Sequence, residues 1–168
     1  MNRRDLMKLG LMTGGLAAAG DALAAAPRGG ARAPSTKAPR VVTPNGSTLP
    51  LREVGGVKVG HLVAEELDHE LAPGLKVKAW GYNGSTPGPT IEVTEGDKVR
   101  LYVTNRLPEP TTVHWHGVIL PNGMDGVSGL NQRPIRPGET FLYEFTFRHA
   151  GTFMYHPHYD EMTQMALG

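Results

Sequence analysis

DKVRLYVTNRL (residues 97–107) and TVHWHGVIL (residues 112–120) are the stretches from which the fold is predicted. In the first, Val99, Leu101 and Val103 alternate with polar residues, which is the period of a strand with one buried face. Short strands separated by turn residues predict an all-β fold, an antiparallel sandwich or barrel, with a short helix starting in residues 159–168. The other strand-like runs are VKVGHLVAEEL (57–67), LKVKAWGYN (75–83), NGSTPGPTIEV (83–93, a turn leading into a strand), ETFLYEFTF (139–147) and GTFMYHPH (151–158).

Two of these runs carry paired histidines. HWHG (114–117) and YHPH (155–158) each place two histidines at i and i+2. On a strand such residues point to the same face, roughly 6.6 Å apart, so two adjacent strands would bring four imidazoles together. Neutral imidazole is a ligand for copper, zinc, iron and nickel. The alternative, hydrogen-bonded side chains without a metal, is preferred for His61, His69 and His149, which lie outside the pattern.

Composition limits the chemistry that this chain can perform. The 168 residues include no cysteine, which excludes a disulfide, a thiol nucleophile and a thiolate-bound metal. Residues 1–40 carry seven Lys or Arg against two Asp, whereas residues 41–168 have a net charge of −4. The basic residues of this second part form no cluster, so nucleic acid is not an expected partner. No phosphate-binding loop and no HExxH zinc motif is present.

The N-terminus is typical of an export signal. Residues 1–26 begin with basic residues, continue into a short apolar run and end in small residues that fit an A-x-A cleavage site. Arg3-Arg4 resembles the twin-arginine signal, with Leu6 at the usual Phe position; an ordinary amphipathic helix is the alternative. Residues 27–48 are predicted to be a flexible linker, and residues 49–168 the folded domain. The protein is therefore expected in the periplasm or secreted, with no membrane span after signal cleavage.

The stretch from TPGPTIEV to YHPH (86–158) closely resembles the first cupredoxin domain of multicopper oxidases, the group that contains laccases and bacterial copper oxidases. This resemblance implies a plastocyanin-like Greek-key β-sandwich and a trinuclear copper cluster where O2 is reduced to water. By position, His114 resembles the type 2 copper ligand, and His116, His156 and His158 resemble the type 3 ligands. Asp125 matches an outer-sphere acid that assists proton delivery, with a simple turn residue as an equal alternative.

The sequence also departs from that family. The remaining histidine ligands, and the cysteine of the type 1 copper site, come from a later cupredoxin domain in the family, and this sequence contains neither. In the family, the stretch that resembles MTQMALG (162–168) leads into a further strand that completes the first domain, so the sandwich is expected to lack its last strand here. We therefore expect half of a trinuclear site, completed by missing cupredoxin domains in cis or in trans. The completed assembly would use O2 and a small reducing substrate, a phenol or a metal ion such as Cu(I).

The sequence leaves two alternative functions open. A non-catalytic periplasmic module that sequesters or delivers copper would use the same histidines, and a cupredoxin-like domain could bind no metal at all. Whether the chain is an enzyme is left open, although the isolated chain is expected to be inactive towards O2. Met162 and Met165 offer soft thioethers for Cu(I), but packing of a short helix is the preferred interpretation.

Overall fold

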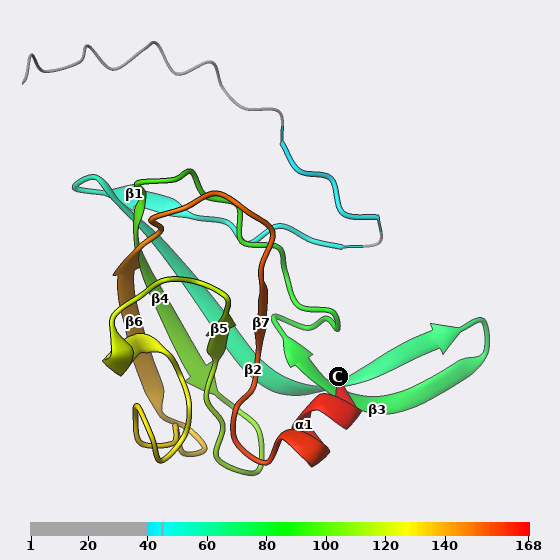
Figure 1. The fold of residues 1–168 in the computed structure, drawn as a ribbon. Helices are drawn as coiled ribbons and strands as arrows, with labels where there is room; N and C mark the ends of the chain where they lie inside the picture. Colours follow the sequence, from blue (N-terminus) through cyan, green and yellow to red (C-terminus); the bar gives the residue numbers. More distant parts are fainter. Residues whose placement is uncertain (1–39, 45) are drawn as a thin grey trace, which may run out of the picture. The chain divides into compact units, whose positions relative to one another are not determined.

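The computed structural model describes residues 40–44 and 46–168 (Figure 1). The expected signal at residues 1–26 and most of the expected linker lie outside the described residues. Residues 39–168 form one compact unit. Within it, Thr48 bridges to Thr90 and the Leu49 side chain is buried. In the described part of the chain no helix has the length and apolar character needed to cross a membrane.

Strands dominate this unit and form two sheets. The larger sheet has the order β1-β2-β4-β6, and β3 pairs with the far half of β2. The smaller sheet consists of β5, which carries His114 and His116, and β7, which carries His156, whereas His158 lies beyond the end of β7. The elements are β1 (Arg52–Val54), β2 (Val57–Ala72), β3 (Leu75–Tyr82), β4 (Lys98–Asn105), β5 (His114–His116), η1 (Asn122–Met124), β6 (Thr140–Thr146), β7 (Met154–His156) and α1 (Glu161–Leu167). The all-β cupredoxin-like fold and the short C-terminal helix are confirmed.

One strand pair corrects the prediction of an antiparallel arrangement. β2 and β4 run parallel, in register from Val57↔Lys98 to Ala64↔Asn105, whereas the other pairs are antiparallel. A parallel pair needs a crossover connection rather than a hairpin. Here β3 turns back along β2, and residues 83–97 then carry the chain to the start of β4, so that β4 enters in the direction of β2 (Figure 1).

Three predicted strands are shorter or absent. β5 ends at His116 because Gly117 adopts a left-handed backbone (φ 81°) and the Val118 amide turns back to the Trp115 carbonyl. β7 ends at His156, directly before Pro157, which has no amide hydrogen to donate. The strand expected in residues 83–93 is reduced to isolated bridges at Ser85 and Thr90.

The core lies between the two sheets. Val99, Leu101 and Val103 of β4 are fully buried, as their alternation predicts. Trp115 points from β5 into the same core, where its ring centroid lies 5.3 Å from that of Tyr143. The Tyr143 hydroxyl accepts a hydrogen bond of 3.0 Å from the Val113 amide, and burial raises the pKa of Tyr143 to about 12. The inward tryptophan therefore fixes which face of β5 the two histidines occupy.

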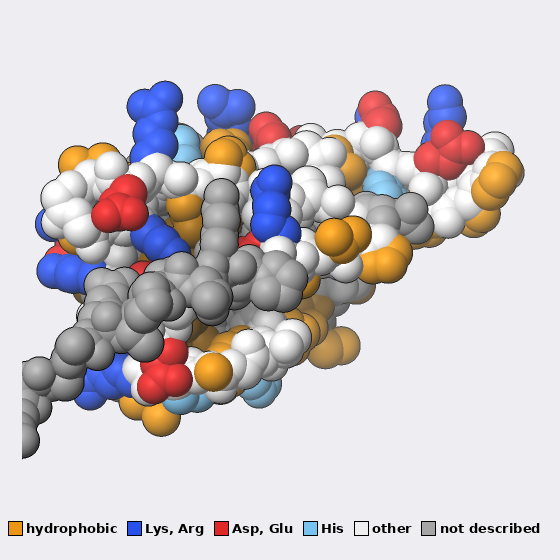
Figure 2. Space-filling model, turned by 90° about the horizontal axis from the view of Figure 1, so that it is seen from above, with side chains coloured by type: hydrophobic (Ala, Val, Ile, Leu, Met, Phe, Trp, Pro, Cys, Tyr) orange, Lys and Arg blue, Asp and Glu red, His pale blue; other side chains and the backbone are white. Residues whose placement is uncertain are grey.

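Charges on the surface are mixed in sign. On the face seen in Figure 2, basic and acidic side chains lie interspersed. Several charged side chains of the domain form ion pairs, including Lys98 with Glu144 at 3.0 Å and Arg106 with Glu65 at 3.5 Å. Exposed pairs of this kind contribute little to stability, because solvent and salt screen the charges.

Candidate metal centre

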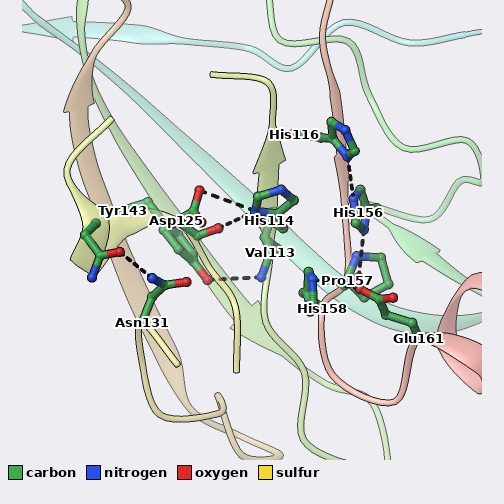
Figure 3. A network of polar contacts seen from close by, with 11 residues as sticks. Val113, His114, His116, Asp125, Asn131, Tyr143, His156, Pro157, His158 and Glu161 are labelled. Atoms are coloured by element: carbon green, nitrogen blue, oxygen red, sulfur yellow. Dashed lines mark hydrogen bonds and ion pairs between the residues drawn. The ribbon is translucent and has the colours of Figure 1, made fainter. Parts of the chain in front are cut away.

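β5 and β7 bring the two histidine pairs together. The strands pair antiparallel with His114 opposite His156 and His116 opposite Met154. Because side chains alternate along a strand, His114 and His116 share one face, and Figure 3 shows their rings beside those of His156 and His158. The ring centroid of His114 lies 5.4 Å from the centroids of His116 and His158, and 5.3 Å from the centroid of His156.

Three of the four histidines form a compact donor group. One ring nitrogen each from His114, His116 and His156 lies within 4.8 Å of the others. The closest approach is 3.3 Å, between His116 Nδ1 and His156 Nε2. Two nitrogens that bind one metal at about 2 Å each lie at most about 4 Å apart, so this spacing fits a shared ion.

Backbone carbonyls determine which nitrogens remain free. His114 Nδ1 lies 2.6 Å from the Asp125 carbonyl oxygen, and His156 Nδ1 lies 2.9 Å from the Pro157 carbonyl oxygen. A carbonyl can only accept, so both Nδ1 atoms carry the proton and both Nε2 atoms are unprotonated in the neutral ring. A histidine ligand whose second nitrogen donates to a carbonyl is the usual arrangement at protein metal sites. The donor set therefore fits copper or another imidazole-binding metal.

His158 is near this group but outside it. Its ring stacks on that of His156 with centroids 6.1 Å apart, yet its Nε2 lies 3.0 Å from Glu161 Oε1 (Figure 3). Glu161 was not among the residues predicted from the sequence. The His-x-x-Glu spacing at the start of α1 was a signal that could have found it. The structure thus brings together three of the four predicted ligands and pairs the fourth with a carboxylate.

Asp125 contacts His114 in two ways. Besides the carbonyl contact, its carboxylate Oδ1 lies 3.5 Å from His114 Nδ1, and its side chain is 33% exposed. Asp125 also ends the short helix η1 and precedes Gly126, whose backbone is left-handed (φ 83°). The residue therefore occupies a turn and borders the histidine group at the same time.

The histidines outside the two pairs, for which a role without a metal was preferred, have other contacts. His61 Nε2 contacts Thr104 Oγ1 at 2.7 Å, and His149 Nε2 lies 3.3 Å from the Gly117 carbonyl oxygen. Within the described residues, the group of His114, His116 and His156 is the one set of three potential ligands found. The preferred interpretation of Met162 and Met165 is wrong: their side chains are 88% and 48% exposed, because α1 turns Gln164 inward instead.

Comparison with known proteins identifies the family. A family model for multicopper oxidases matches residues 64–168. The chain belongs to the multicopper oxidase family. The matched region includes all four paired histidines, Asp125 and the strands β3 to β7. Membership implies copper as the metal, in agreement with the imidazole donor set.

The relatives of this multicopper oxidase chain are longer proteins. It is 47% identical over 85 residues to copper resistance protein A of Escherichia coli, covering 51% of this chain and 14% of that protein. It is 41% identical over 120 residues to L-ascorbate oxidase of Nicotiana tabacum, covering 69% of this chain and 21% of that protein. The crystal structure of a multi-copper oxidase from Pseudomonas thermotolerans superposes with a TM-score of 0.64 at 45% identity, covering 66% of this chain and 27% of that one. These similarities support a copper-binding oxidase domain and do not favour a separate copper-sequestering module.

Proposed function

We propose that this domain supplies half of the histidine ligands of a trinuclear copper cluster in an exported multicopper oxidase. His114 would hold the type 2 copper, and His116, His156 and His158 would hold the type 3 coppers. The observation that carries this proposal is the convergence of His116 Nδ1 and His156 Nε2 at 3.3 Å, beside the free Nε2 of His114. When bound, copper would supply the redox chemistry that reduces O2 to water with electrons from a reducing substrate.

The protein contributes position and proton handling. The Asp125 and Pro157 carbonyls fix the orientation of His114 and His156, and the Trp115 ring in the core keeps β5 facing the group. The Asp125 carboxylate is 3.5 Å from His114 Nδ1 and partly exposed, so it can accept a proton from solvent and hold a water molecule at the edge of the site. We assign Asp125 the role of an outer-sphere acid on this basis.

The remainder of the oxidase would come from further cupredoxin domains, in cis or in trans. These would add the other histidines and the type 1 copper that collects electrons from a phenol or a metal ion such as Cu(I). The basic start, apolar run and small residues of positions 1–26 support export by the twin-arginine route to the periplasm or beyond. Residues 27–48 would link this signal to the domain at 49–168.

Copper content and O2 consumption test the proposal together. The purified chain is loaded with Cu(II) and washed, copper is measured by elemental analysis, and O2 uptake is recorded with a phenol or Cu(I). We expect about one tightly held copper ion per chain, because His116 Nδ1 and His156 Nε2 lie close enough to share an ion, and no O2 uptake. The double variant His116→Ala/His156→Ala should lose this copper, whereas the matched control His61→Ala/His69→Ala should keep it. Equal copper content in both variants would refute the assignment of His116 and His156 as copper ligands. Sustained O2 uptake would refute the proposal that this chain holds only half of the cluster's ligands.

A further inference from the structure

Gln164 is the buried residue of α1. Its side chain is 2% exposed, although it belongs to a helix whose other residues face solvent wholly or in part. Its Oε1 accepts a hydrogen bond of 2.7 Å from Thr111 Oγ1. Its Nε2 donates to Glu109 Oε1 at 2.7 Å and to the Pro110 carbonyl at 2.8 Å. The buried side-chain amide thus has hydrogen-bond partners for both donor hydrogens and for its oxygen, so it avoids the free-energy cost of an unpaired buried polar group, and these partners fix the orientation of the side chain.

These partners lie at the entrance to the first histidine strand. Residues 109–111 precede β5 by a few positions, and Thr111 is itself anchored by reciprocal backbone hydrogen bonds with Ile135. Gln164 lies after β7, six positions beyond His158. The amide therefore connects the segment that leads into one histidine pair with the helix that follows the other pair.

The strands themselves hold the two pairs together weakly. β5 and β7 are three residues long and share three register pairs. The inward Trp115 fixes the face of β5, but so short a ladder provides few hydrogen bonds, and the segments that flank the two strands therefore contribute to their relative position. The same helix that carries Gln164 also places Glu161 against His158. α1 is thus in contact with His158 through Glu161 and with the segment before β5 through Gln164.

We propose that Gln164 is a positioning residue of the copper site, which sets the placement of His158 and the position of α1 relative to the segment before β5 through its contacts with Glu109, Pro110 and Thr111. This inference rests on the proposed copper function for its role, but the structural effect can be measured without metal. Gln164 touches none of the ligands, so it acts through α1 and through the segment before β5.

The chemistry of the contact defines the variants. Gln164→Glu keeps the acceptor for Thr111 but removes both donors and places a second carboxylate against Glu109. The double variant Gln164→Glu/Glu109→Gln exchanges donor and acceptor, so one hydrogen bond between the two side chains is restored. Val99→Ala, in the fully buried part of β4, provides a control that lowers stability without touching these contacts.

Two readouts on the full chain decide the proposal. With copper, Gln164→Glu should bind Cu(II) roughly tenfold more weakly and with a changed EPR hyperfine splitting, as expected when a residue that orients ligands is lost. The double variant should recover most of the Cu(II) affinity and of the wild-type hyperfine splitting, and Val99→Ala should keep the wild-type spectrum. Without copper, amide hydrogen exchange in residues 114–116 and 154–156 should rise more in Gln164→Glu than exchange in β4.

The outcomes separate this inference from the proposed function. A wild-type chain that binds no copper refutes the proposed function, and the exchange data then decide the role of Gln164 alone. Wild-type copper affinity and spectrum in Gln164→Glu would overturn the inference. A uniform increase of exchange over all strands, as in Val99→Ala, would overturn it as well, because it would show loss of global stability only.

Discussion

Replacing Gly126 by alanine should damage both the fold and the histidine group. Gly126 has a left-handed backbone (φ 83°), in which an L-residue costs about 1–2 kcal/mol. An added Cβ would overlap the Val113 carbonyl oxygen and lie 2.9 Å from the His114 amide nitrogen. Overpacking against backbone that cannot rotate away costs about 1–3 kcal/mol more. Gly126→Ala should therefore lower the free energy of unfolding by about 2–5 kcal/mol.

Urea denaturation with a matched control measures this effect. Gly129 is also left-handed (φ 76°), but an added Cβ there would meet no atom within 4 Å. Gly129→Ala should therefore cost only the backbone term, about 1–2 kcal/mol. Because Gly126 follows Asp125, whose carbonyl holds His114, Gly126→Ala should also weaken Cu(II) binding while Gly129→Ala does not. Equal destabilisation and equal copper affinity in the two variants would refute the close approach of β5 to this turn.

Substitutions at three further positions test contacts that stabilise the domain. Tyr143→Phe leaves the buried Val113 amide without its acceptor and should cost about 1–3 kcal/mol in urea denaturation. Burial raises the pKa of Tyr143 to about 12, so the stability that the protonated Tyr143 hydroxyl contributes is complete below pH 10 and is lost as the pH rises from 10 towards 12. Tyr143→Phe should therefore lose less stability than the wild type over this pH range. An equal loss in both proteins would contradict the role of the Tyr143 hydroxyl. The hydrogen bond from Arg100 is the main cause that lowers the pKa of Glu144, so the stability that ionised Glu144 contributes is present above the ordinary Glu pKa and is lost as the pH falls through the lowered value. In Glu144→Gln the unfolding temperature should therefore fall less steeply at acidic pH than in the wild type, and added salt should reduce the difference between the two proteins. Trp115→Ala should cost about 3–5 kcal/mol, and Trp115→Phe clearly less, because the indole Nε1 has no hydrogen-bond partner to lose.

The local pattern of the sequence predicted the elements that the core uses. Alternation in residues 99–103 places three side chains in the core, and the i, i+2 spacing puts His114 and His116 on one face of β5. These features depend only on the alternation of side chains along a strand, so they can be predicted from the sequence without a structure. The convergence of His114, His116 and His156 follows from them once β5 and β7 pair.

The features that were missed depend on contacts distant in sequence. The parallel pairing of β2 and β4 results from the path of residues 83–97, which has no periodic signal. Glu161 and Gln164 are ordinary polar residues of a helix in the sequence, and only the packing of α1 shows that one contacts His158 and the other is buried. The exposure of Met162 follows from the same packing, since a single face of a short helix can point inward.

Pulsed EPR of the Cu(II)-loaded chain tests the central claim most directly, because nitrogen modulation from the remote imidazole nitrogens reports how many histidines bind the ion. We predict more than one bound imidazole in the wild-type chain, and loss of this signal in the variant His114→Ala/His116→Ala/His156→Ala, with the signal retained in His61→Ala/His69→Ala. The same imidazole signal in the triple variant, or a copper ion bound without imidazole in the wild type, would contradict the claim that these three histidines form the metal centre.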